Sequence, residues 1–147
     1  MELKSKQDTV TELANKLFVY TDQRDWDKLL KEVLMEKVEF DMTSAGGGPA
    51  KTMTASEICQ MWTAGLEGID FIHHQSGNFI VNFKNDGTEA NIFCYATATH
   101  YKAAAQHGKS REFVGSYELR AEFTDLGWRL AAFRFNLKYI NGNKDLL

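Results

Sequence analysis

Two β-patterned runs joined by one tight turn constrain this chain more than any other feature. The first run covers Phe71–Phe83 and the second covers Glu89–Tyr101. Residues 84–88 between them contain Asn, Asp and Gly in succession, which favour the backbone conformations of hairpin turns. We therefore expect an antiparallel hairpin here. Three of the four histidines lie in this stretch, and pairing around the turn brings His74 toward His100 at the open end.

Length and composition are those of one globular domain spanning residues 1–147. A chain of 147 residues is long enough to bury a core of its own. The net charge of -3, with both signs mixed along the chain, provides no basic stripe. We therefore expect no nucleic-acid partner.

The sequence also bears on compartment and redox state. No apolar run approaches the roughly 20 residues that span a bilayer, so we expect no membrane partner. The segment Met1–Lys6 lacks the apolar core of a signal peptide, which favours the cytoplasm. In that compartment Cys59 and Cys94 are expected to be two buried thiols rather than a disulfide.

Helical signals are concentrated in the first half of the chain. Apolar residues recur at i, i+3 and i+4 over residues 8–24, which predicts an amphipathic helix. Asp25 can cap a second, shorter helix that begins at Trp26. A short strand at residues 38–42 and a mobile glycine-rich loop at 44–49 follow. Residues 54–57, Thr-Ala-Ser-Glu, form a capping box that opens a third helix.

The second half of the chain is β-patterned. After the hairpin, residues 113–123 alternate cleanly, and a turn at 124–127 leads into a last strand at 128–139. Helices first and strands last, without βαβ alternation, predict an α+β domain with helices on one face of a mainly antiparallel sheet. The ends, residues 1–6 and 141–147, are expected to fray.

Both faces of the predicted sheet carry apolar side chains. On the strand after the hairpin turn, Ala98 and His100 share one side with Ile92, while Phe93 and Tyr95 lie on the other. A large exposed aromatic face usually marks an interface, so we expect a homodimer through the sheet. The alternative is a bulge near Ala131-Ala132 that returns the apolar residues of the last strand to one core.

The order of several motifs resembles a known family. These motifs are Tyr20-Thr21-Asp22-Gln23-Arg24-Asp25-Trp26, Phe40-Asp41, the capped helix with Trp62, His74-Gln75-Ser76-Gly77-Asn78, the run Glu89–Tyr101, Gly115-Ser116-Tyr117 and Gly127-Trp128-Arg129-Leu130. Together they resemble the SnoaL-like group of the nuclear-transport-factor-2-like superfamily, which includes polyketide cyclases and scytalone dehydratase. The resemblance implies a cystatin-like cone, with three N-terminal helices packed on a strongly curved sheet that encloses an apolar pocket.

The resemblance to scytalone dehydratase implies catalytic roles for Asp22, His74 and His100. A histidine titrates near neutral pH and can take or give a proton, and a carboxylate beside it fixes its tautomer. The two tyrosines that hold a water in the dehydratase are not matched, because Thr21 and Met42 stand where they are expected. The alternative for both histidines is a structural role as hydrogen-bonded groups at strand ends.

Several further residues are candidates for the pocket wall. Aromatic side chains at such spacing also suit a plain core, and Asn78 can instead hydrogen-bond the loop of His74. The candidates are Tyr20, Trp26, Phe40, Met42, Trp62, Asn78, Tyr117 and Phe135.

Two functions fit these features. The first is a small-molecule enzyme of the dehydratase, isomerase or cyclase kind, which uses histidine and aspartate for proton transfer on an apolar, carbonyl-bearing substrate. It is expected to need no cofactor or metal. The second is a non-catalytic module of the same fold that binds a small apolar or aromatic ligand or assembles with a protein through the sheet.

Overall fold

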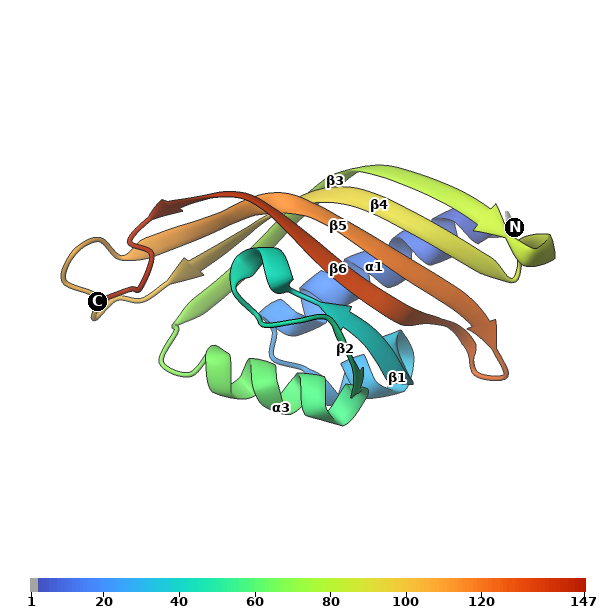
Figure 1. Ribbon diagram of the computed structural model, residues 1–147, viewed down its shortest axis with the longest axis horizontal. Coiled ribbons are helices and arrows are strands. Elements are labelled where there is room, and N and C mark those ends of the chain that lie inside the picture. Colours follow the sequence, from blue (N-terminus) through green and yellow to red (C-terminus); the bar gives the residue numbers. More distant parts are fainter. Residues whose placement is uncertain (1–2) are drawn as a thin grey trace.

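The computed structural model describes residues 3–147, which form one curled, open six-stranded sheet with helices on its inner face (Figure 1). The strand order is β2-β1-β6-β5-β4-β3. β1 and β6 are parallel, and every other neighbouring pair is antiparallel. The predicted α+β class is confirmed. The strands are β1 (Leu34–Asp41), β2 (Lys51–Thr54), β3 (Phe71–Lys84), β4 (Glu89–Tyr101), β5 (Ser110–Thr124) and β6 (Gly127–Gly142).

The β3–β4 hairpin forms where the sequence predicts it. Lys84 pairs with Glu89 next to the turn, and His74 pairs with Ala98 near the open end. The turn residues Asn85 and Asp86 have φ values of 51° and 56°, a left-handed conformation that these residue types tolerate. This pairing places the inward side chains of β3 and β4 on one shared surface.

Helix α1 (Lys6–Asp22) packs against the edge strand β3, under the arch of the sheet in Figure 1. Its N-cap is Ser5, whose hydroxyl accepts a hydrogen bond from the Asp8 backbone N–H at 3.0 Å. Its buried face is the predicted apolar stripe, which includes Leu13, Leu17 and Phe18. The helix ends two residues earlier than expected, so that Asp22 is its last residue.

Two further helical segments follow. Asp25 caps α2 (Trp26–Lys28), as predicted, and α2 continues as one π-helical turn, Leu29–Val33. The predicted capping box of Thr54 and Glu57 opens α3 (Ala55–Gly65). Strand β2, which precedes α3 and pairs with β1, is too short and polar to have been recognised in the sequence.

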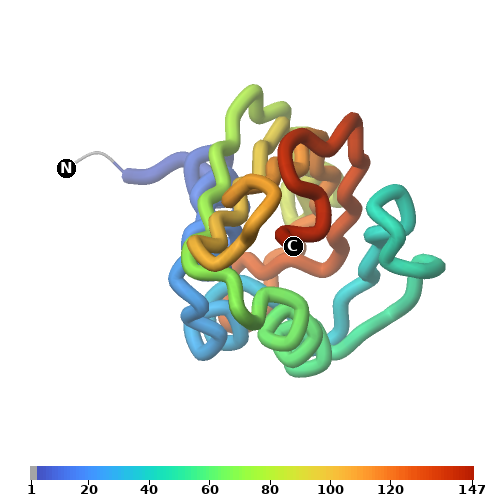
Figure 2. Tube along the Cα trace, turned by 90° about the vertical axis from the view of Figure 1, so that its left-hand side faces the viewer, coloured from blue at the N-terminus to red at the C-terminus, as the bar shows by residue number. Residues whose placement is uncertain are grey.

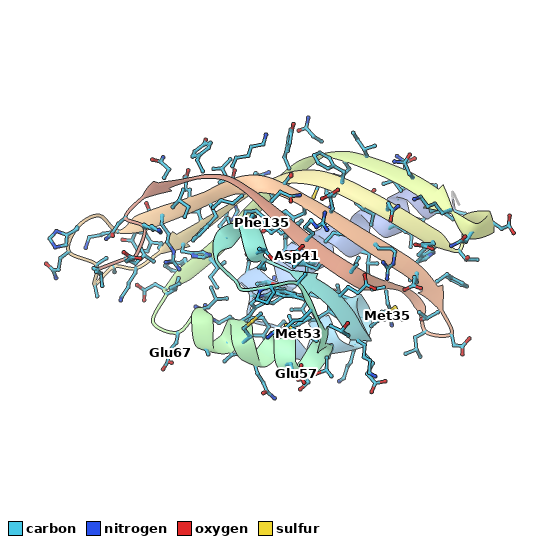
Figure 3. All side chains as sticks on the ribbon, in the orientation of Figure 1. Met35, Asp41, Met53, Glu57, Glu67 and Phe135 are labelled. Atoms are coloured by element: carbon cyan, nitrogen blue, oxygen red, sulfur yellow. The ribbon has the colours of Figure 1, made fainter. Side chains whose placement is uncertain are left out.

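A bulge in β6 returns most of its apolar side chains to one core. Arg120 pairs with Ala132 while Ala121 pairs with Leu130, so Ala131 is the extra residue. Trp128 and Leu130 before the bulge, and Phe133 and Phe135 after it, therefore enter one core. Figure 3 shows Phe135 and Met53 on the inner side of the sheet, whereas Glu57 and Glu67 point away from it.

The outer face of the sheet retains exposed aromatic rings. Tyr95 and Tyr101 on β4 are 43% and 38% exposed, and Tyr139 on β6 is 57% exposed. The bulge removes the β6 aromatics before Tyr139 from this face, so the apolar surface is smaller than the sequence suggested. The homodimer through the sheet stays a prediction.

The C-terminal tail differs from expectation. We predicted a frayed end at 141–147, yet β6 extends to Gly142 and the backbone N–H groups of Gln106 and His107 donate to the Leu147 carbonyl. Leu146 is buried in a small cluster with Ile69 and Ile72. Figure 2 shows this red tail beside the orange 102–109 loop at one end of the sheet.

At the other end of the chain, part of the predicted fraying falls on residues 1–2, which lie outside the described residues. Lys6 already belongs to α1, and Ser5 is its cap.

Cys59 and Cys94 are both buried free thiols, as predicted. Within residues 3–147, none of the helices is long and apolar enough to cross a lipid bilayer.

Gly115 allows β5 and β6 to approach closely beside the core aromatics. A Cβ at this position would lie 2.2 Å from the Asn136 carbonyl oxygen and 2.8 Å from a ring carbon of Phe135. The Gly115→Ala variant should therefore lose roughly 2 kcal/mol of unfolding free energy, measured by urea denaturation.

Gly77→Ala on β3 is the matched control, because nothing lies within 4 Å of its added Cβ. Equal stabilities of the two variants would contradict this account of the β5–β6 packing.

Candidate functional site

A cavity of about 420 Å³ opens between the inner face of the sheet, the end of α1 and the end of α3. This volume is typical of pockets for small organic ligands. Most of its wall is aliphatic or aromatic, and the polar groups come from β3, β4, β5 and α1. The lining residues are Leu17, Phe18, Thr21, Met42, Ala45, Trp62, Gly65, Leu66, Ile72, His74, Ala98, His100, Arg111, Phe113, Tyr117, Phe133 and Phe135.

Asp22 and His74 form a hydrogen-bonded pair at one side of the cavity. The Asp22 Oδ1 atom lies 2.5 Å from His74 Nδ1, and Asp22 Oδ2 accepts the His74 backbone N–H at 3.0 Å. An ionised carboxylate only accepts hydrogen bonds, so the proton of the neutral ring lies on Nδ1. That leaves the Nε2 atom of His74 with a lone pair.

The topology explains why a carboxylate sits at this point. β3 is an edge strand, and the backbone N–H of His74 has its partner in Asp22 of α1 rather than in a further strand. A carboxylate at a helix C-terminus is disfavoured by the helix dipole. The two hydrogen bonds to His74 offset that cost and join α1 to the sheet edge.

His100 occupies the same inner surface but has a different partner. His74 faces Ala98 and His100 faces Ile72 across the β3–β4 pair, so the two histidines are diagonal neighbours. The Nε–H of Arg111 donates to His100 Nδ1 at 3.0 Å. Arginine has no acceptor, so Nδ1 of His100 must carry the lone pair, and the ring proton lies on Nε2.

Burial and neighbouring charges keep His100 neutral. Burial is the largest cause that lowers the pKa of His100, to about 4, followed by the positive charge of Arg111. His74 and Arg24 lower this pKa further, and only Asp22 raises it. The His100 ring is therefore an uncharged hydrogen-bond donor near neutral pH.

Tyr117 adds a hydroxyl to the wall from β5. Burial is the main cause that raises its pKa above the usual phenol range, so the hydroxyl stays protonated. Its ring lies 5.0 Å from Phe18 and 4.8 Å from Phe135, centroid to centroid. The Phe18 ring also stacks on His74 at 5.2 Å, so aromatic packing fixes both polar groups.

Each of the two cavity histidines has one ring nitrogen that the protein does not use. In the described part of the chain, no hydrogen bond involves Nε2 of His74 or of His100. No fully buried side-chain nitrogen or oxygen there lacks a partner. Both Nε2 atoms must therefore remain accessible, and both rings line the cavity.

The expected wall residues divide into two groups. Met42, Trp62, Tyr117 and Phe135 line the cavity, together with His74 and His100, while Asp22 lies behind His74. Tyr20, Trp26, Phe40 and Asn78 are not part of the wall.

The excluded residues lie in other environments. The Tyr20 ring lies under the Lys28 ammonium at 5.4 Å, and Trp26 packs against the outside of the core. Phe40 stacks on Phe133 within the core at 5.2 Å. Asn78 has a φ of 57° and forms the bulge of β3.

Thr21 and Met42 occupy the positions where the resemblance expects tyrosines, and both line the cavity. The Thr21 hydroxyl donates to the Leu17 carbonyl at 2.7 Å within α1. The hydroxyl is thus already used, and a methyl group and a thioether replace two phenols in this wall.

Arg111 is the site residue that sequence reasoning missed. The strand predicted at 113–123 starts too late, because β5 begins at Ser110 and pairs Arg111 with His100. The alternation of Phe113, Gly115 and Tyr117 on the inner face, extended two residues back, would have found it.

Two other features of the described chain bear on the choice of site. Within residues 3–147, no cluster of three or more His, Cys, Asp or Glu is placed to hold a metal ion, and the cofactor-free site stays a prediction. A hollow of about 670 Å³ lies on the outer face, but its arginines are already paired: Arg120 with Glu39 and Arg134 with Asp41, each at 3.2 Å.

The lowered pKa of His100 predicts a pH-dependent stability. The folded chain resists protonation of His100 down to about pH 4, while the unfolded chain takes up a proton below about 6.5. The stability that neutral His100 gives the folded chain is fully present above pH 6.5. As the pH falls from 6.5 toward 4, the free energy of unfolding decreases by up to about 1.4 kcal/mol per pH unit.

Urea denaturation from pH 7 to 4.5 measures the effect. The unfolding free energy of the wild type should fall relative to that of His100→Gln as the pH drops. The control is the wall variant Phe113→Leu, because neither phenylalanine nor leucine titrates. The difference in unfolding free energy between the wild type and this variant should stay constant with pH. A constant difference from His100→Gln would contradict the buried neutral histidine.

Comparisons with known proteins agree with this fold. The family model described as a SnoaL-like domain matches residues 5–134. The protein Kfla4162 from Kribbella flavida superimposes with a TM-score of 0.89 at 24% identity, over 96% of this chain and 95% of that chain. No curated protein matches the sequence significantly.

Two further solved structures are more distant. A protein from Novosphingobium aromaticivorans with the provisional name scytalone dehydratase has a TM-score of 0.77 at 13% identity, over 91% and 85% of the two chains. The type 3 LinA hexachlorocyclohexane dehydrochlorinase from Novosphingobium barchaimii LL02 has a TM-score of 0.72 at 14% identity, over 92% and 88%. The family model spans most of the chain, and the protein therefore belongs to the SnoaL-like family.

Proposed function

We propose that this protein is an enzyme that removes a proton from a carbon next to a carbonyl group, in an apolar small molecule. The observation that carries the proposal is the Asp22–His74 pair. Asp22 Oδ1 lies 2.5 Å from Nδ1, which leaves a basic Nε2 on the wall of an apolar cavity. A base held in one tautomer and facing a bound substrate is the arrangement that general base catalysis requires.

The chemistry can be written with His74 as the only group that changes protonation. Its Nε2 takes the proton from the carbon acid, and the electron pair of the C–H bond moves into an enolate. In an elimination, the enolate re-forms the carbonyl, a C=C bond forms, and the bond to the leaving group breaks. A departing hydroxide takes the proton back from His74 and leaves as water, so the enzyme returns to its starting state.

The wall of the cavity suggests the substrate class. Aromatic rings of Phe18, Trp62, Tyr117 and Phe135 line the same cavity as His74. A flat aromatic or polyketide-like ketone would bury its rings against them. The low polarity of the site also strengthens the interactions of its few polar groups.

The names of two structural neighbours are consistent with this proposal. A dehydratase and a dehydrochlorinase both remove a small molecule from adjacent carbons. Thr21 and Met42 lack the phenols that hold a water in scytalone dehydratase. We therefore propose direct proton transfer by His74 rather than transfer through a held water.

The presence of Thr21 and Met42 in place of two tyrosines supports a second candidate function. Without the two phenols, the cavity can serve as a ligand-binding site in a non-catalytic module, and the outer sheet face can receive a partner chain. The two functions differ in what His74 does, because a binding module needs its shape and not its basicity.

Proton exchange tests the proposal without knowledge of the leaving group. The protein is incubated with a panel of bicyclic aromatic ketones in D₂O, and NMR follows deuterium uptake at the carbon beside the carbonyl. His74→Ala should lower the exchange rate of an accepted ketone by roughly 10²- to 10⁴-fold. His73→Ala is the control, since His73 is the exposed neighbour on the other face of β3.

Asp22→Asn separates base chemistry from binding. An asparagine keeps the size of the side chain but no longer provides the negative charge that holds the ring proton on Nδ1. The exchange rate should fall while the dissociation constant of the ketone changes by less than about tenfold. Binding of ketones without exchange in the wild type would favour the non-catalytic module.

A further inference from the structure

We propose that Arg111, anchored by the C-terminal tail, is a positioning residue that holds His100 as a neutral Nε2–H donor aimed at a substrate oxygen. The two cavity histidines would then have opposite roles, with His74 as the base and His100 as the donor. This inference rests on the proposed function and specifies the group that the substrate must present beside its acidic carbon.

The tautomer of His100 follows from the chemistry of its partner. The Arg111 Nε–H donates to His100 Nδ1 at 3.0 Å, and a guanidinium has no lone pair to offer in return. Nδ1 is therefore the acceptor, and the single proton of the neutral ring must lie on Nε2. The opposite reasoning applies to His74, whose Nδ1 meets a carboxylate.

Arg111 is itself held in place by the end of the chain. Its Nη1 donates to the Lys144 carbonyl at 2.8 Å, and its guanidinium carbon lies 5.2 Å from the centre of the Phe113 ring. The Lys144 carbonyl is fixed in turn, because Leu146 is buried against Ile69 and Ile72. The tail seen beside the 102–109 loop in Figure 2 is thus connected to His100 through one side chain.

The charged and titratable groups that act on His100 come from four elements or loops. Arg111 lies on β5, His74 on β3, Asp22 at the end of α1, and Arg24 just after it. Arg24 is tied back, with its Nη2 bonded to the carbonyls of Leu66 and Ile69. The cationic groups disfavour a second proton on the ring, so His100 is kept as a neutral donor and not as an acid.

This arrangement selects a substrate with a neutral acceptor beside the acidic carbon. A ketone or ester oxygen that accepts from His100 Nε2–H would become an enolate oxygen as His74 removes the proton. The hydrogen bond strengthens as negative charge develops on that oxygen, which lowers the barrier. A hydrocarbon of the same shape would leave the Nε2–H without a partner in an apolar cavity.

Long-range ¹H–¹⁵N correlation spectra of the imidazole rings test the tautomers directly. In the wild type, His100 should show Nε2–H and His74 should show Nδ1–H, and His73 and His107 serve as exposed references. A His100 ring protonated on Nδ1 overturns the inference and leaves the His74 proposal intact. A His74 ring protonated on Nε2 would instead contradict the proposed function.

The Arg111→Met variant tests the positioning role. It should convert His100 into a mixture of tautomers and raise its pKa from about 4, because a donor and a positive charge are both removed. Arg111→Lys keeps the charge but not the Nε donor, so the mixture should appear with a smaller rise in pKa. Arg134→Met on the outer face is the matched control. An unchanged His100 spectrum in Arg111→Met would overturn the inference.

A ligand pair tests the selection for an acceptor. 1-Indanone and indane share a bicyclic frame and differ by the carbonyl, and their binding is measured by NMR titration. The wild type should bind 1-indanone roughly 3- to 10-fold more tightly than indane, the worth of one hydrogen bond. Arg111→Met should reduce this ratio toward one. Equal affinities in the wild type would overturn the inference even if ketone exchange by His74 is observed.

Discussion

The carboxylate of Asp22 connects the two halves of this fold and organises one side of its cavity. It lies at the last residue of α1, where the helix dipole disfavours a negative charge, and it accepts from both the backbone and the ring of His74 on edge strand β3. The backbone contact covers part of an edge that would otherwise expose hydrogen-bonding groups. The ring contact fixes the tautomer that leaves Nε2 free. One interaction therefore closes the helix onto the sheet and prepares a base at the same point.

The second histidine shows how the choice of partner sets the character of an imidazole. His74 and His100 are diagonal neighbours on one surface, yet one Nδ1 meets a carboxylate and the other meets a guanidinium. The first partner requires a ring proton on Nδ1, and the second excludes one. Because the two rings share one apolar cavity, the difference cannot come from solvent. It comes from the element that lies behind each ring. This is the end of α1 for His74 and the start of β5 for His100.

The sequence predicted those features that depend on neighbours along the chain. The hairpin followed from the Asn85-Asp86-Gly87 turn, the start of α3 from its capping box, and the inward face of β4 from simple alternation. It could not predict features that depend on distant contacts. Phe40 stacks on Phe133 because the parallel β1–β6 pair brings them together, and no local pattern distinguishes such a ring from one on a cavity wall. The tail is polar and looked free to fray, but Leu146 meets Ile69 and Ile72 across a sequence gap of more than 70 residues.

The replacement of two phenols by Thr21 and Met42 changes what the cavity can tolerate. With the Thr21 hydroxyl bonded to Leu17, the polar groups left to meet a ligand are the two Nε2 atoms, the Tyr117 hydroxyl and part of Arg111. Each of these is held by packing or by a hydrogen bond, so it cannot turn away from a ligand that fails to match it. A site of this kind discriminates mainly through the cost of leaving a buried donor without a partner, about 1–3 kcal/mol for each group. Shape alone, set by flexible and aromatic side chains, would discriminate much less. If the protein is catalytic, its selectivity should therefore reside in the position of one oxygen relative to one acidic carbon, and the carbon skeleton of the substrate should be free to vary.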